Sequence, residues 1–192
     1  MKRRSTLMAM TGHISTGFVL GGLVLAGLAL GTLMLARPAA AAGDEPGIGP
    51  VSKLPMPRYV SLKADSVNLR EGPNRDHPVK WIFKRAGLPV EITAEFEQWV
   101  RIRDSDGTEG WVLHNLLSAR RTALVAPWSK EASIPLFERP DAGSNMVAKL
   151  QPRVLASVRD CSREWCRLKG DKFDGYMQED KLWGVYPREN VE

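Results

Sequence analysis

An internal repeat constrains the fold of this chain more than any other feature of the sequence. The aligned segments, in chain order, are VNLREGP (67–73) with IPLFERP (134–140), Val90 with Val154, QWVRI (98–102) with EWCRL (164–168), EGWV (109–112) with DGYM (174–177), and NLL (115–117) with KLW (181–183). The offset varies only between 64 and 67 residues, as expected when loops change in length and strands do not. The sequence therefore predicts two copies of one domain of about 60 residues, a size that can just fold alone.

Each copy has the hydrophobic pattern of short β-strands. Val67 and Leu69 alternate with Asn68 and Arg70, so the two pairs face opposite sides of a strand. In the first copy, strands are predicted at Tyr59–Leu62, Ser66–Arg70, Val79–Lys84, Leu88–Ala94, Trp99–Arg103 and Gly110–Leu113. No segment from residue 58 onward keeps a helical period. The predicted fold is all-β, with two tandem antiparallel barrels at residues 58–118 and 120–187.

Residues 1–42 read as a targeting segment. A basic start (Lys2 to Arg4) precedes an uncharged stretch at 14–36, and small residues follow, which is typical of a signal peptide cleaved after Ala41 or Ala42. The uncharged stretch has 23 residues, which is also long enough for an uncleaved membrane anchor. In both cases the rest of the chain is exported, to the periplasm or cell envelope. Residues 43–57 contain four prolines and are predicted to be a linker.

Export affects how the charge and the cysteines are interpreted. Of the 27 basic side chains, four lie in residues 1–42, which leaves 23 against all 22 acidic ones. Because a nucleic-acid-binding protein needs a basic excess, nucleic acid is not expected as a partner. Cys161 and Cys166 are predicted to form a disulfide across a hairpin, and two buried thiols are the alternative.

The repeated motifs resemble the bacterial SH3-like domain family. The opening VNLREGP, the strand QWVRI, the turn before EGWV and the closing LL follow one another over 58–118 and, more loosely, over 120–187. The layout, with WGVYP at 183–187, is similar to exported two-repeat SH3 domain-containing proteins of Gram-negative bacteria. The resemblance implies two five- or six-stranded SH3-like barrels and, in many relatives, attachment to cell wall or peptide ligands.

Catalysis is not predicted. A cysteine nucleophile needs a nearby base, but His77 and His114 lie near predicted turns of the first copy and both cysteines lie in the second. Two thiols without histidines nearby make a poor zinc site, so we expect no metal and no cofactor. The chain is expected to be a binding module and not an enzyme.

The first copy is the better candidate for a ligand site. Asn68, Arg70, Trp81 and Trp111 are the predicted contacts, because exposed tryptophans beside polar groups suit peptides and sugars. Trp99 and Trp165 recur in both copies, which favours a packing role for them.

The second copy has lost the polar residues of its opening strand. Pro135 and Phe137 stand in place of Asn68 and Arg70. The leading hypothesis is an envelope module that recognises peptidoglycan or a peptide segment through the first barrel. The alternative is a structural or protein–protein adaptor without a small ligand. Exposure of Trp81 and Trp111 on one face would favour the first function, and burial of both would favour the second.

Overall fold

The computed structural model describes residues 47–191. The predicted signal or anchor (14–36) and the cleavage positions Ala41 and Ala42 lie outside these residues. Within the described part there is no α-helix, and no helix there is long and apolar enough to cross a membrane. The described residues form one compact unit.

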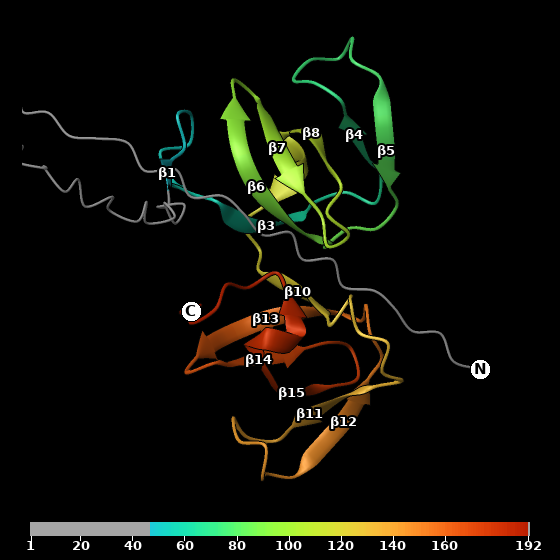
Figure 1. The fold of residues 1–192 in the computed structure, drawn as a ribbon, viewed down its shortest axis with the longest axis vertical. Helices are drawn as coiled ribbons and strands as arrows, with labels where there is room; N and C mark the ends of the chain where they lie inside the picture. Colours follow the sequence, from blue (N-terminus) through green and yellow to red (C-terminus); the bar gives the residue numbers. More distant parts are fainter. Residues whose placement is uncertain (1–46, 192) are drawn as a thin grey trace, which may run out of the picture. The chain divides into compact units, whose positions relative to one another are not determined.

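Two seven-stranded antiparallel sheets make up this unit (Figure 1). Barrel 1 consists of β3 (Arg58–Leu62), β4 (Val67–Arg70), β5 (Val79–Phe83), β6 (Pro89–Phe96), β7 (Trp99–Arg103), β8 (Glu109–Leu113) and β9 (Leu117–Ser118). Barrel 2 consists of β10 (Thr122–Val125), β11 (Ile134–Phe137), β12 (Met146–Leu150), β13 (Leu155–Ser162), β14 (Trp165–Lys169), β15 (Asp174–Gln178) and β16 (Leu182–Trp183). The 3₁₀ turns η1 (His114–Leu116) and η2 (Glu179–Lys181) precede the last strands, and β1 (Gly47–Ile48) pairs with β2 (Pro55–Met56) ahead of barrel 1.

The two sheets have the same strand order. It is β5-β4-β8-β7-β6-β3-β9 in barrel 1 and β12-β11-β15-β14-β13-β10-β16 in barrel 2. Equivalent strands also carry equivalent irregularities, since the register shifts at Thr93 in β6 and at Arg159 in β13. The predicted all-β fold with two tandem barrels is therefore confirmed.

Each barrel has its own hydrophobic core, as the alternating pattern predicts. Val67 and Leu69 are fully buried while Asn68 between them is exposed. The barrel 1 core is Leu62, Val67, Leu69, Phe83, Val90, Ile92, Val100, Ile102 and Val112. The barrel 2 core is built by the equivalent strands around Ile134, Leu136, Leu168 and Met177. Burial of these apolar side chains drives each sheet to fold around its own core.

The alignment of Val90 with Val154 is wrong by two residues. The carbonyl of Leu88 accepts the N–H of Leu62, and the carbonyl of Val154 accepts the N–H of Val125. Val154 is therefore equivalent to Leu88. A loop between the strands differs in length, and an isolated apolar match cannot reveal such a shift.

The alignment of Leu117 with Trp183 is wrong by one residue. Leu117 pairs with Leu62, while its structural counterpart Leu182 pairs with Val125. A one-residue shift reverses the face on which a strand side chain lies. Trp183 is thus not a closing core residue of barrel 2.

Trp183 contacts barrel 1 instead. Its ring meets Tyr59 edge-on, with centroids 5.2 Å apart, and its Nε1–H donates to the carbonyl of Pro89 over 3.2 Å. Tyr186 also packs against Tyr59, at 4.6 Å. The WGVYP segment is therefore one part of barrel 2 that packs on barrel 1.

A buried carboxylate extends this contact. Glu91 of barrel 1 is only 2 % exposed, and it accepts hydrogen bonds from Arg103 at 2.8 Å and from the Tyr186 hydroxyl at 2.7 Å. Burial and the hydrogen bond to Glu91 raise the pKa of Tyr186, so its phenol stays protonated and donates. Because a buried charge needs such partners, Glu91 holds Tyr186 in one position.

Cys161 and Cys166 form a disulfide, as predicted. They are directly opposite each other on β13 and β14, with Cα atoms 4.0 Å apart. The backbone N–H and C=O of Cys161 bond to Val191 on the other side, so the cysteines occupy a close, non-hydrogen-bonded pair. The bridge therefore links the hairpin at the point where the C-terminal segment joins barrel 2.

We expect Cys161→Ser to lower the free energy of unfolding of barrel 2 by about 2 kcal/mol, because the bridge closes only a short loop. Thermal unfolding followed by circular dichroism should show a Tm lower by about 5–10 °C with an unchanged β-sheet spectrum. Wild-type protein treated with a reductant should unfold like the variant. A reduced protein that melts at the oxidised Tm would contradict a stabilising role for the bridge.

Candidate functional site

The outer face of β4, β8 and β7 carries the polar residues of the first repeat. Asn68 and Arg70 lie outside the core because Val67 and Leu69 fill the inward positions. Arg70 is directly opposite Trp111 on β8, so these two side chains share the outer face.

A groove of about 300 Å³ opens on this face, and its lining includes Asn68, Arg70, Arg75, Trp99 and Leu113. Trp99 is only 5 % exposed, but it alternates with the core residue Val100 and so belongs to the outer face. The groove lining thus combines one large, almost fully buried apolar ring with two guanidinium groups and an amide. Sequence reasoning missed Trp99 as a groove residue, because its recurrence in both repeats indicated packing alone.

The guanidinium of Arg70 is held in place by its own loop. It donates to the carbonyl of Arg75 at 3.0 Å and to that of His77 at 2.7 Å. The loop is itself ordered by Asn74, whose Oδ1 accepts the N–H groups of Asp76 and His77. Because Arg70 is already positioned, a bound anion would require little ordering of this side chain.

Trp111, which lies opposite Arg70, lines a second hollow. The second hollow has a volume of about 660 Å³ and is lined by Lys80, Arg101, Glu109 and Trp111, among others. Arg101 and Glu109 form an ion pair there. The half-buried Trp111 ring therefore lines this polar hollow and not the groove.

Trp81 does not join the other three predicted contacts. It is 57 % exposed and lies opposite Leu69 on the end strand β5, whereas Trp111 lies opposite Arg70. Neighbouring residues of β4 face opposite sides, so Trp81 and Trp111 are on different faces of the sheet. The structure brings together Asn68, Arg70 and Trp111, and it separates Trp81 from them.

Barrel 2 has a different surface at the equivalent place. Phe137, which replaces Arg70, packs edge-on against Trp165 with ring centroids 5.8 Å apart. Pro135 replaces Asn68 and is exposed, and Tyr176 replaces Trp111. An aromatic contact thus occupies the position where barrel 1 has a charged side chain.

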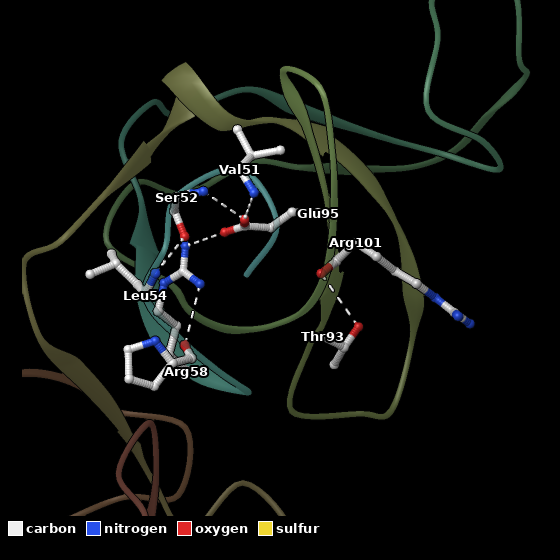
Figure 2. A network of polar contacts seen from close by, with 8 residues as sticks. Val51, Ser52, Leu54, Arg58, Thr93, Glu95 and Arg101 are labelled. Carbon is white, nitrogen blue, oxygen red and sulfur yellow. Dashed lines mark hydrogen bonds and ion pairs between the residues drawn. The ribbon is translucent and has the colours of Figure 1, made fainter. Parts of the chain in front are cut away.

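The buried carboxylate of Glu95 in barrel 1 binds an N-terminal arm, residues 47–56 (Figure 2). Glu95 Oε2 accepts the N–H groups of Val51 at 3.1 Å and Ser52 at 2.9 Å, and Oε1 accepts from Arg58 at 2.8 Å. Burial alone would raise the pKa of Glu95, but the hydrogen bonds from Ser52, Arg58 and Val51 outweigh it and lower the pKa to about 2. Glu95 corresponds to Cys161 of barrel 2, because each pairs with the equivalent position of β7 or β14.

We expect Glu95→Gln to release the arm, because a neutral amide binds Arg58 and two backbone N–H groups more weakly. Trypsin should then cleave after Lys53 faster than in the wild type, while Glu97→Gln, an exposed neighbour, should not change the rate. In the wild type, the stabilisation is complete above pH 4.5 and is lost as the pH falls through about 2, because the folded pKa is the depressed one. Amide NMR shifts of Val51 and Ser52 should follow that titration, and unchanged shifts down to pH 2 would contradict it.

The remaining candidates are the two histidines and the two cysteines that were considered for catalysis. His77 lies in the loop after β4, His114 is exposed, and both cysteines are in the disulfide. Among residues 47–191, no group of histidine, cysteine and acidic side chains is arranged to hold a metal ion.

Residues 63–119 and 130–184 match the family model "Bacterial SH3 domain". The chain belongs to the bacterial SH3 domain family. Bacterial SH3 domains are commonly cell-wall binding modules, and the family together with the disulfide indicates an extracellular or envelope protein. A search of curated proteins gives no match.

Three solved structures show weak similarity to this bacterial SH3 protein. NlpC2 and NlpC1 of Trichomonas vaginalis are each 12 % identical, with TM-scores of 0.30, and the matches cover 67 % and 70 % of this chain and 48 % of each of theirs. An NlpC/P60 family protein of Bacillus cereus is 9 % identical with a TM-score of 0.29, over 65 % of this chain and 55 % of that one. The chain thus spans about half the length of these proteins, and such scores support no transfer of function.

Proposed function

We propose that this bacterial SH3 protein is a non-enzymatic module of the cell envelope that recognises peptidoglycan or a peptide segment through barrel 1. The observation that carries the proposal is the groove on the outer face, where Arg70 and Asn68 lie beside the buried ring of Trp99. Guanidinium groups bind carboxylates, and an aromatic ring binds the apolar face of a sugar or side chain. The peptide stems and glycan of peptidoglycan present both kinds of group.

The two barrels of this chain serve as an internal comparison for the proposal. They share strand order and register, but only barrel 1 has a charged side chain at the position where barrel 2 places Phe137 on Trp165. A ligand that needs a carboxylate contact would therefore prefer barrel 1. Trp111 lies opposite Arg70 on β8, and we include it with Asn68 and Arg70 in the proposed contact set.

The test is co-sedimentation of the chain from residue 43 onward with purified peptidoglycan sacculi. We expect the wild type to bind, Arg70→Ala to bind about tenfold more weakly, and Trp111→Ala to lose a similar amount, because each contact contributes about 1–2 kcal/mol. The matched controls in barrel 2 are Phe137→Ala and Tyr176→Ala, which should bind as the wild type does. Equal losses in both barrels would place recognition elsewhere.

A second function is favoured by one observation. The end strand β5 exposes Val79, Trp81 and Ile82, at 41 %, 57 % and 41 %. An end strand with exposed apolar side chains can pair with a segment of another protein, as an adaptor would require. If sacculi do not bind and Trp81→Ala abolishes capture of an envelope protein, the adaptor function replaces the groove proposal.

A further inference from the structure

A third hollow, of about 690 Å³, lies where barrel 1 meets barrel 2. Its walls come from the loop between β5 and β6, from β10 and β13, and from the loop between β14 and β15. The walls are joined directly, because the Thr122 hydroxyl donates to the carbonyl of Gly87 at 2.7 Å. The hollow therefore exists only in the two-barrel chain.

The lining of this hollow is strongly basic. Its five cations are Arg85, Arg120, Arg159, Lys169 and Lys172, and its one carboxylate is Asp171. Among the described residues, Lys169 is the only one of these five cations that forms an ion pair, with Asp174 at 3.8 Å. The chain beyond residue 42 has a net charge close to zero. The positive charge is therefore concentrated at this hollow and is not typical of the rest of the chain.

We propose that this basic hollow binds an anionic glycan chain, at a site separate from the groove of Asn68 and Arg70. Several exposed cations along a concave surface match a linear polymer with repeated carboxylate groups. The half-buried Phe173 ring lines the same hollow and offers an apolar surface to a sugar ring.

Other polyanions fit the hollow less well. An acidic peptide would seek a free strand edge, but β10, β13 and β14 each have a neighbour on both sides. Single-stranded nucleic acid needs several stacking rings, and the lining includes one, Phe173. An anionic lipid surface is flat and reaches a concave wall poorly.

The experiment measures binding of the chain from residue 43 onward to oligogalacturonate, a linear chain of sugar carboxylates, by isothermal titration. The test variant is Arg85→Glu with Lys172→Glu, which removes one cation from each barrel. The matched control is Lys63→Glu with Lys149→Glu, two exposed lysines that change the net charge equally. We expect the test variant to bind about tenfold more weakly and the control to remain within about twofold.

Binding should also weaken as salt rises from about 0.01 M to about 1 M, because the screening length falls from about 30 Å to about 3 Å. Equal weakening in the control variant would overturn the proposal, since it would show attraction to net charge alone. Equally tight binding of polyglutamate, oligo-dT or phosphatidylglycerol vesicles would also overturn it in favour of that partner. Circular dichroism of both variants verifies that a loss does not come from unfolding.

Discussion

Replacing Gly110 by alanine is expected to lower the free energy of unfolding of barrel 1 by about 3 kcal/mol. A Cβ at this position would lie 2.6 Å from the Leu69 side chain and 2.7 Å from the backbone carbonyl oxygen of Arg70. A flexible side chain could move aside, but the carbonyl belongs to β4, which is paired with both β5 and β8. The strands must therefore separate to accommodate one methyl group.

The effect of Gly110→Ala can be measured as a fall in Tm of about 10 °C or more by calorimetry. The same change at Gly175 should cost barrel 2 a similar amount, because its Cβ would meet the Phe137 carbonyl oxygen at 2.7 Å. Gly47→Ala is the control, since nothing lies within 4 Å of its added methyl group. A Gly110→Ala protein with the same Tm as Gly47→Ala would show that β4 and β8 are less closely packed than the structure indicates.

Gly110→Ala is also expected to affect ligand binding, because β4 carries residues of the proposed groove site. Asn68 and Arg70 are on the strand that Gly110→Ala would displace. Gly110→Ala should therefore weaken binding to sacculi, whereas Gly175→Ala should leave it unchanged at a temperature where both proteins are folded.

Replacing Trp183 by alanine is expected to separate the unfolding of the two barrels. The change removes the edge-on contact with Tyr59 and the hydrogen bond to the Pro89 carbonyl. Truncation of a buried aromatic side chain costs about 3–5 kcal/mol, and the half-buried Trp183 should be near the lower end. Because each barrel has its own core, this loss falls on the contact between them and not on either core.

Calorimetry should show one transition for the wild type and two for Trp183→Ala. Trp128→Ala is the matched control, because that ring is 57 % exposed and it should leave a single transition. Tyr186→Phe should have a smaller effect in the same direction, of about 1.5–3 kcal/mol, because Glu91 loses one donor but keeps Arg103. A single unshifted transition in Trp183→Ala would mean that the aromatic contact does not couple the barrels.

The strands of barrel 1 were predictable because a strand half buried in a small core must alternate apolar and polar residues. Trp99–Arg103 was predicted with its observed bounds, and Val67 and Leu69 were placed correctly in the core. The repeat then extended this prediction to barrel 2. The pairing of Cys161 with Cys166 was also predictable, because a short hairpin brings residues of its two strands opposite each other.

The sequence alone determined the fold class, the duplication and the loss of polar residues in the opening strand of barrel 2, and it favoured the disulfide over two buried thiols. Only the tertiary structure decided which side chains share a surface. It placed Trp81 and Trp111 on different faces, because the face depends on strand pairing and on one-residue shifts that a local pattern does not record. It also gave Trp183, Tyr186 and Glu91 their contact, and gathered Arg85 with Lys172, because these residues are far apart in the chain and meet only when two finished barrels pack together.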